Sequence, residues 1–257
     1  MKWDIYTKGI SIKMKKFITV IFVIIFILTI SVTSVCARAG GGSSGGGGSS
    51  GGGHSSGHYS SYGTNSNPIA RIINYVIFFI FLTASTIFFR WKLFKAKRNS
   101  KKLMRLLDNK DEAWKYRNIQ KQVEEAYFKI QNAWTEEDMS SARDYMEESL
   151  YENFQMKLEW MKVGNKHNVL KKISLIDAIP VSVYDNSDNK KDYVWYYIRG
   201  SMIDYTIDTT TNLMIEGSNS KTKFVEYWKF IRIENRWVLS QILQEDEKNK
   251  IPFQDEK

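Results

Sequence analysis

Residues Ile72–Phe89 read IINYVIFFIFLTASTIFF, a run of 18 residues in which Asn74 is the strongly polar member. A helix of that length just spans the hydrocarbon core of a bilayer, which is about 30 Å thick. We therefore predict a transmembrane helix over residues 69–91. The run leaves one alternative open, a buried and wholly apolar helix of a soluble domain, which the charges that follow it disfavour.

A polybasic juxtamembrane segment, residues 92–109, follows this run, and no acidic residue precedes Asp108 in it. Lys and Arg beside a membrane helix favour the cytoplasmic side and attract anionic lipid at about 1 kcal/mol per cation. We therefore expect everything after Arg105 to be cytoplasmic. The residues expected to contact lipid headgroups are Arg90, Lys92, Lys95, Lys97, Arg98, Lys101, Lys102 and Arg105.

Residues 1–39 have the pattern of a secretory signal. Lysines precede an apolar run, Phe17–Val35, that ends at the small-residue sequence Ala37-Arg38-Ala39. The run is longer than most signal cores, so we predict either a cleaved signal peptide or an uncleaved signal anchor. The chain then crosses the membrane once or twice, and its C-terminal half lies on the same side in both cases.

Residues 40–68 form a low-complexity segment that holds 12 of the 16 glycines. Such a segment buries too little apolar surface to offset its ordering entropy, so we predict a disordered extracytoplasmic chain. His54 and His58 could share a metal ion, but two histidines in a Gly/Ser chain make a weak site, and we predict none. Cys36 is the one cysteine, which excludes a disulfide framework and multi-cysteine zinc sites.

The charges are divided unequally between the two parts of the chain. Residues 1–107 hold 15 Lys and Arg against one acidic residue, and residues 108–257 hold 22 against 27, so the net charge of +9 divides into +14 and −5. A nucleic-acid-binding domain displays its cations on the folded domain itself. The sequence therefore favours attraction to a membrane and disfavours nucleic acid as a partner.

After residue 109 the apolar residues recur every three or four positions, which predicts two helices. The first helix spans Asp111–Trp134. We expect Thr135-Glu136-Glu137-Asp138 to cap a second helix that ends near Gly164, with a break near Ser149 as an alternative. The apolar stripe of the first helix is Tyr116, Ile119, Val123, Tyr127, Ile130 and Trp134.

From Leu170 the apolar period changes to two, which predicts strands. Pro180 lies inside the first strand and predicts an edge position or a bulge there. In the second strand, residues 193–208, we expect one apolar face that Arg199 interrupts and one solvent-facing side that carries Asp204.

Two further segments, 223–233 and 236–243, predict a final hairpin, and residues 246–257 predict a polar tail that frays. Helices followed by strands give an α+β domain. The predicted fold is a set of N-terminal helices packed on a curved antiparallel sheet of four or five strands, preceded by the transmembrane helix.

Short motifs follow one another in a characteristic order after residue 129. They are Ile130-Gln131-Asn132-Ala133-Trp134, Asp138, Gly164, Asn168, Asp204-Tyr205-Thr206-Ile207-Asp208, Glu226-Tyr227-Trp228-Lys229-Phe230-Ile231-Arg232, Trp237-Val238-Leu239 and Gln241-Ile242. In this order they resemble the bacterial branch of the family built on the C-terminal domain of mitochondrial inner-membrane translocase subunit 44. The resemblance covers residues 110–245.

This resemblance implies a fold related to the nuclear transport factor 2-like cone, with helices cupped against the sheet around an apolar pocket. In the mitochondrial relatives the domain docks on anionic lipid beside a protein translocation channel and tethers a chaperone motor. This chain departs from them because it has its own predicted spanning helix and no counterpart of the motor-recruiting part. The resemblance thus implies a membrane-proximal binding role in the plasma membrane of a bacterium.

The domain offers few residues for chemistry. We find no phosphate loop, metal-ligand spacing or Ser-His-Asp order, so we predict no enzyme and no cofactor. His167 is expected on a surface loop, and Arg199 is expected either to pair with a buried carboxylate or to contact a ligand anion. The aromatic residues that could line an apolar pocket, or else fill an ordinary core, are Trp134, Trp195, Tyr197, Tyr205, Trp228, Phe230 and Trp237.

Taken together, these features predict a non-enzymatic, membrane-anchored scaffold whose cytoplasmic domain docks a partner at the membrane surface, in protein transport or membrane-protein assembly. The predicted partners are anionic membrane lipid and a membrane-associated protein. Two alternatives stay open: a pocket enzyme or small-molecule binder of the nuclear transport factor 2-like kind, and a tether for ribosomes or RNA that uses the polybasic segment.

Overall fold

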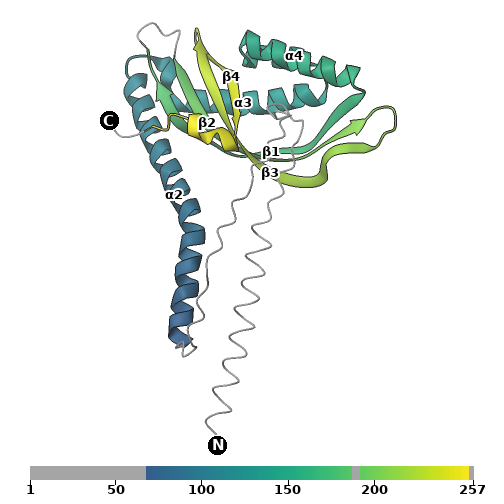
Figure 1. Ribbon diagram of the computed structural model, residues 1–257. Coiled ribbons are helices and arrows are strands. Elements are labelled where there is room, and N and C mark those ends of the chain that lie inside the picture. The colour runs from purple at the N-terminus through teal and green to yellow at the C-terminus, as the bar shows by residue number, and fades with distance from the viewer. Residues whose placement is uncertain (1–67, 187–191, 255–257) are drawn as a thin grey trace, which may run out of the picture. The chain divides into compact units, whose positions relative to one another are not determined.

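The structure, a computed structural model, describes residues 68–186 and 192–254 (Figure 1). The predicted signal, residues 1–39, and the predicted Gly/Ser segment up to residue 67 lie outside the described residues. The elements in chain order are α2 (Pro68–Asp108), the 3-10 helix η1 (Glu112–Trp114), α3 (Tyr116–Thr135), the 3-10 helix η2 (Met139–Tyr145), α4 (Glu148–Val163), β1 (Lys166–Tyr184), β2 (Tyr193–Asp208), β3 (Met214–Ile233), β4 (Arg236–Gln244) and the 3-10 helix η3 (Glu245–Lys250).

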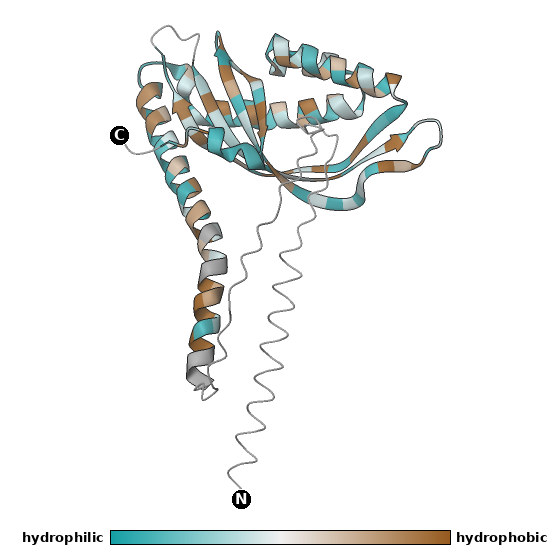
Figure 2. Cartoon of the chain, in the orientation of Figure 1, coloured by the Kyte–Doolittle hydropathy of each residue, from teal (hydrophilic) through white to brown (hydrophobic). Residues whose placement is uncertain are grey.

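The helix α2 is continuous over 41 residues and contains both the apolar run and the polybasic segment. Its first half exposes large apolar side chains, among them Ile80 and Phe88, and most of the turns that Figure 2 colours in this half are brown, the hydrophobic colour. Its second half buries Ala96, Ser100 and Met104, which are four residues apart and so share one helix face. Across the part of the chain that the structure describes, no helix has both the length and the apolar character required to cross a membrane.

The four strands form one antiparallel sheet in the order β1-β2-β3-β4. This arrangement confirms the predicted α+β class and the curved antiparallel sheet. Pro180 lies in β1, which is an edge strand, and the register of β1 with β2 shifts between Pro180 and Ser182. Both features predicted for this proline, an edge position and a bulge, are therefore present, because proline cannot donate a ladder hydrogen bond.

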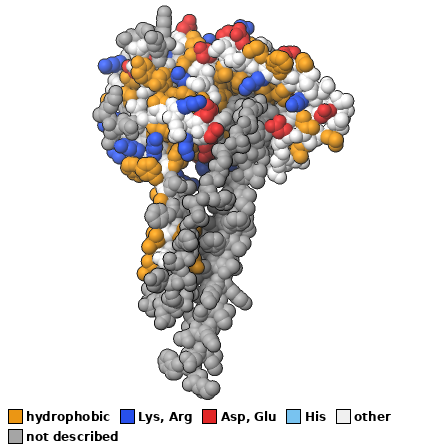
Figure 3. Space-filling model, viewed as in Figure 1, with side chains coloured by type: hydrophobic (Ala, Val, Ile, Leu, Met, Phe, Trp, Pro, Cys, Tyr) orange, Lys and Arg blue, Asp and Glu red, His pale blue; other side chains and the backbone are white. Residues whose placement is uncertain are grey.

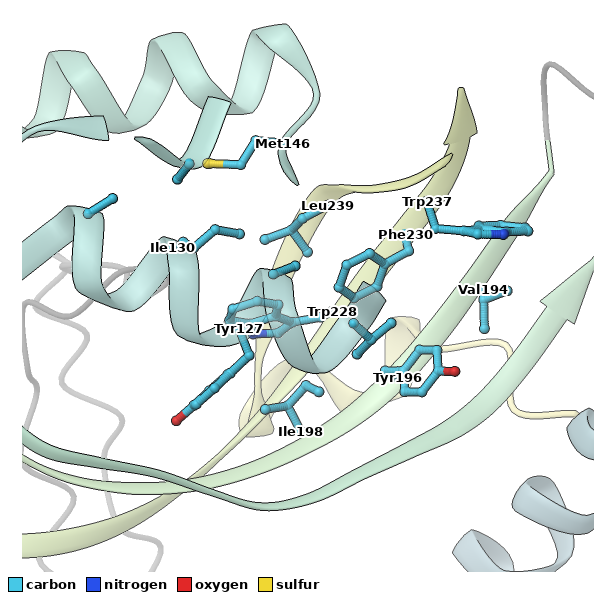
Figure 4. Packing of buried hydrophobic residues seen from close by; sticks show 14 of the residues in the cluster. Tyr127, Ile130, Met146, Val194, Tyr196, Ile198, Trp228, Phe230, Trp237 and Leu239 are labelled. Atoms are coloured by element: carbon cyan, nitrogen blue, oxygen red, sulfur yellow. The ribbon is translucent and has the colours of Figure 1, made fainter. Parts of the chain in front are cut away.

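The helix-side core lies between α3, α4 and one face of the sheet (Figure 4). The predicted apolar stripe of α3 supplies it with Ile119, Val123, Tyr127, Ile130 and Trp134, all buried. In Figure 4, Tyr127 and Ile130 of α3 face the ring of Trp228 and the side chain of Leu239 from the sheet. Rings pack against rings here: Tyr127 and Trp228 have centroids 5.6 Å apart. Aromatic side chains therefore occupy the space between the helices and the sheet.

The segment between α3 and α4 differs from the predicted capping box. Thr135 ends α3, and its hydroxyl donates to the carbonyl of Gln131 instead of capping the next helix. Asp138 is the N-cap, and its carboxylate accepts from the amide of Ser140 at 2.9 Å. This cap begins η2, and α4 begins separately at Glu148, which agrees with the alternative of a break near Ser149.

The opposite face of the sheet, which carries the predicted apolar face of β2, is also covered. The side of β2 that was predicted to face solvent carries Val194, Tyr196 and Ile198 of the helix-side core, so that prediction was wrong for the central part of β2. The group of residues on the opposite face, the outer cluster, contains buried residues from α2, the sheet and the segment after η3. Its buried members are Ala96, Val181, Trp195, Tyr197, Tyr227, Leu243 and Ile251. The predicted fraying tail was wrong as far as residue 254, because η3 and the residues that follow it pack on the sheet.

Asp204 was predicted to face solvent, and that prediction was also wrong. Its side chain is buried, and one carboxylate oxygen accepts from the Nδ2 of Asn168 at 2.9 Å. The Oδ1 of Asn168 in turn accepts from the indole Nε1 of Trp134, also at 2.9 Å. A buried polar group needs such partners, and this short network joins α3, β1 and β2 at one end of the sheet.

Candidate functional site

A charged groove lies where the apolar half of α2 ends against the outer face of the sheet. Its volume is about 490 Å³, which is within the range of small-molecule and headgroup sites. Four elements line it: α2, β1, β2 and η3. The lining residues are Thr86, Phe89, Arg90, Leu93, Asp177, Tyr197, Arg199, Glu245 and Lys248.

Local geometry explains why these side chains converge. Thr86, Phe89, Arg90 and Leu93 are spaced by three or four residues, so they share one face of α2. In β2, side chains two positions apart point to the same face of the sheet, which places Tyr197 beside Arg199. Asp177 of β1 stands opposite Arg199 in the strand register. Together these spacings bring charges from three elements to one surface.

The ion pair at the base of the groove joins the Nη2 of Arg199 to the Oδ2 of Asp177 at 2.5 Å. Arg199 was predicted either to pair with a carboxylate or to contact a ligand anion, and this pair accounts for one side of its guanidinium. Its Nε is buried and has no hydrogen-bond partner among the described residues. The Nε–H is thus a buried donor without a protein acceptor, and the exposed part of the guanidinium carries the positive charge that faces the groove.

The remaining charges stand around this pair. Lys248 of η3 has its ammonium group 5.6 Å from the ring centroid of Phe89, the last residue of the apolar run. The ring of Phe89 in turn lies 6.2 Å from that of Tyr197. Burial raises the pKa of the Tyr197 phenol, which therefore stays protonated at neutral pH and can donate a hydrogen bond. Three cations and two carboxylates thus line the groove, a balance that favours an anionic group.

The eight predicted headgroup contacts lie at different heights along α2 and in different surroundings. Arg90 lines the groove. The ammonium groups of Lys92 and Lys101 lie over the rings of Phe253 and Tyr116, at 4.3 and 4.0 Å from the ring centroids. Figure 3 shows Lys and Arg side chains gathered at the border between the apolar half of α2 and the rest of the domain. Of the other five, Lys95 and Lys97 are half-buried, and Arg98, Lys102 and Arg105 are exposed.

The seven aromatic residues that could have lined one pocket are divided between the two faces of the sheet. Trp195 and Tyr197 belong to the outer cluster, and of the seven only Tyr197 lines the groove. Tyr205 is half-buried, and its hydroxyl accepts from the ammonium group of Lys171 at 3.1 Å. The members that lie in the helix-side core are Trp134, Trp228, Phe230 and Trp237.

His167 contacts Glu137, with 2.6 Å between its Nδ1 and the carboxylate Oε1, at the start of β1. Within the described residues, no group of three or more His, Cys, Asp or Glu side chains is placed to hold a metal ion. His54 and His58 lie outside these residues.

Sequence reasoning missed two features of the surface. The first is the groove itself, because Arg90, Arg199 and Lys248 come from three segments far apart in the chain. The second is an exposed apolar stripe on α4 formed by Met156, Trp160 and Val163. A signal for this stripe was present in the sequence, since these residues have helical spacing on the side opposite the buried Phe154 and Leu158.

Comparisons with known proteins place this chain as follows. The model of the Tim44-like domain family matches residues 100–244, which confirms the resemblance predicted from the sequence. Among solved structures, the intermembrane space region of the chloroplast protein ARC6 has a TM-score of 0.33 and 10% identity, covering 48% of this chain and 92% of that one. A SEC-C motif containing protein from Rhodopseudomonas palustris has a TM-score of 0.23 and 11% identity, and the match covers 44% of this chain and 70% of that one. No curated protein matches the chain.

Proposed function

Because the chain belongs to the Tim44-like domain family, we propose that it is a membrane-anchored scaffold in protein transport whose domain docks a lipid or protein partner at the membrane surface. One observation carries this proposal. The helix that begins with the apolar run continues without a break into the domain, where Ala96, Ser100 and Met104 are buried. The apolar half and the domain are therefore joined by a stiff connection.

The proposed anchor is residues 69–91. In the printed sequence the run Ile72–Phe89 contains no charged residue, and its described side chains are largely exposed. Exposed apolar surface of this extent is costly in water and is favourable in a bilayer.

Cysteine labelling tests the anchor, because Cys36 is the one native cysteine. In a Cys36→Ser chain we introduce either Ser60→Cys, before the run, or Asn219→Cys, after it. We expect a membrane-impermeant maleimide added to intact cells to label the first variant and to label the second only after permeabilisation. Labelling of Asn219→Cys in intact cells would contradict the topology, as would release of the whole chain from membranes by alkaline carbonate.

The groove is the proposed contact with anionic headgroups. Arg90 directly follows the apolar run, and Lys248 lies over the ring of Phe89, so both cations stand at the level where a membrane helix leaves the hydrocarbon. Arg105 lies about 22 Å farther along α2 by the helical rise of 1.5 Å per residue. A helix that crosses the bilayer steeply therefore brings the groove to the headgroups and leaves Lys102 and Arg105 away from them.

Matched charge reversals test this placement. We expect the double variant Arg90→Glu/Lys248→Glu to bind about thirtyfold less phosphatidylglycerol, because each of the two cations near the surface is worth about 1 kcal/mol and a tenfold change corresponds to about 1.4 kcal/mol. The control Lys102→Glu/Arg105→Glu makes the same change in net charge and should change binding less than about twofold. The measurement is native mass spectrometry of the full chain from vesicles of phosphatidylcholine and phosphatidylglycerol. Equal losses in the two variants would refute the groove as the headgroup site.

No specific observation favours the alternative functions. A pocket enzyme would need an acid or base in a cavity between α3 and the sheet, and aromatic rings occupy that space in Figure 4. The cations that an RNA tether would use are spread along α2, and Lys92 and Lys101 lie over rings of the domain. We therefore propose the scaffold role alone.

A further inference from the structure

Helix α4 carries an exposed apolar surface on the side turned away from the core. Met156, Trp160 and Val163 are 52%, 76% and 77% exposed, and these three residues are called the α4 stripe here. They are spaced by three or four residues, so they form one continuous surface along the helix. Single exposed apolar residues are common on protein surfaces, whereas a group that includes tryptophan and methionine has the composition of an interface core.

The helix beneath the α4 stripe is packed on the domain. Tyr151, Phe154 and Leu158 of α4 are buried in the helix-side core, and the ring of Phe154 lies 5.6 Å from that of Trp134 in an edge-to-face arrangement. The stripe is therefore displayed by a fixed element. Because its side chains point away from this core, their replacement should leave the fold intact.

Carboxylates border one side of the α4 stripe. Glu152 lies one turn before Met156, and Glu159 lies one turn before Val163, so both carboxylates follow the same edge of the stripe. Both glutamates are exposed. The partner of Glu159 is the exposed Lys162, at 3.4 Å, and a surface pair of this kind contributes little to stability. Both carboxylates are therefore available to cations of an incoming molecule.

The lysine on the other border of the stripe is turned away from it. The ammonium group of Lys157 lies 5.6 Å from the centroid of the Phe154 ring, which belongs to the core. A partner therefore meets apolar side chains with negative charge along one edge. This surface repels anionic lipid and complements an amphipathic helix whose apolar residues are bordered by Lys or Arg, since opposite charges across an interface fix orientation and register.

We propose that the α4 stripe is the docking site for an amphipathic helix of another protein, in which apolar residues recur every three or four positions and Lys or Arg stand beside them. The inference rests on the proposed scaffold role and names the chemistry of its protein partner. The stripe lies on the helix side of the sheet, and the groove lies on the outer face. Its test involves neither the anchor nor the groove, so the outcome is independent of the topology and lipid experiments.

A designed helix tests the apolar part of the site. The probe is a dye-labelled peptide of leucine and lysine with helical spacing, about 18 residues long so that it can form a helix, and its counterpart carries glutamate in place of lysine. Binding to the full chain in a non-ionic detergent is followed by fluorescence anisotropy, with empty micelles as the background. We expect Trp160→Ala to weaken binding of the lysine peptide about tenfold or more, because tryptophan is a frequent interface hot spot. The control Leu213→Ala removes another exposed apolar side chain and should change binding less than about twofold.

A charge swap tests the carboxylate border. The variant Glu152→Lys/Glu159→Lys should bind the lysine peptide about tenfold more weakly than the native chain and the glutamate peptide correspondingly more tightly. The control Glu112→Lys/Glu125→Lys makes the same change in net charge at exposed positions outside α4. It should change either affinity less than about twofold.

The readouts separate the outcomes. Equal binding of the lysine peptide by the native chain and by Trp160→Ala overturns the proposal, and so do equal effects of the two charge variants. If Trp160→Ala fails to fold by circular dichroism, the charge variants, which keep the apolar residues in place, carry the test alone. A concentration-dependent dimer of the full chain that Trp160→Ala abolishes also overturns the proposal, because the α4 stripe would then bind a second copy.

Discussion

Replacing Arg232 with alanine is expected to lower the free energy of unfolding by about 4 kcal/mol. The Arg232 side chain is 7% exposed and pairs with Asp111 and with the fully buried Asp192, whose Oδ2 lies 3.3 Å from its Nη1. Its removal leaves the carboxylate of Asp192 buried without a counter-charge. Asp111 is the N-cap of η1, so the same arginine also fixes the chain just after α2.

Urea unfolding of the full chain in mild detergent, followed by tryptophan fluorescence, measures this loss. The matched control is Arg236→Ala. Arg236 pairs with Asp144 at 3.6 Å, and both side chains are exposed, so we expect a change below about 1 kcal/mol. Losses of similar size in the two variants would contradict a buried role for Arg232.

The pH dependence of the Arg232→Ala effect has a definite sign. Burial raises the pKa of Asp192 above its ordinary value, and removal of the arginine raises it further. A protonated Asp192 has no charge to compensate, so the penalty should be largest at neutral pH and shrink as the pH falls through the raised pKa. The hydrogen bond from Arg232 lowers the pKa of Asp111, and the stability from that pair is present above the unfolded pKa and lost as pH falls through the folded one. Both contributions therefore make the variant approach the native chain in acid.

Replacing Trp228 with alanine should also cost about 4 kcal/mol, the usual loss for a large core aromatic residue. Trp228 is fully buried, packs on Tyr127, and donates from its indole Nε1 to the buried carboxylate of Glu226 at 2.9 Å. The substitution therefore removes ring contacts and a hydrogen-bond donor together.

The matched control for this substitution is Trp160→Ala on α4. Trp160 is 76% exposed, and its replacement should change stability by no more than about 0.5 kcal/mol. Thermal unfolding of the two variants, compared with the native chain, distinguishes a core residue from a ligand-lining one. A small loss for Trp228→Ala would indicate that the ring borders a space that a ligand or water can fill.

Much of the fold followed from local patterns. The stripe of α3 predicted the residues that face the sheet, and Pro180 predicted both an edge strand and a bulge. The sequence also singled out Arg199, which pairs with Asp177 at the base of the groove. These predictions succeeded because helix and strand periodicity depend on residues only a few positions apart.

The elements that cover the outer face could not be predicted in this way. The cover needs Ala96 from α2 and Ile251 from the segment after η3, and these residues lie on either side of the whole sheet in sequence. A signal for burial on both faces was nevertheless present, because residues 193–198 of β2 form a continuous apolar run, which is typical of a strand covered on both sides. Distance along the chain also explains the wrong expectation for Asp204, whose partner Asn168 is 36 residues away.

The sequence by itself determined which segments are helices and strands, where the long apolar run lies, and how the charge divides between the two parts of the chain. Only the tertiary structure decided which charges and edges meet. Arg232 contacts Asp111 across 121 residues, and Gln254 contacts Val183 across 71. The physical reason is that amphipathic periodicity depends on residues only a few positions apart. An ion pair or an edge-strand contact forms only when folding brings distant segments of the chain together.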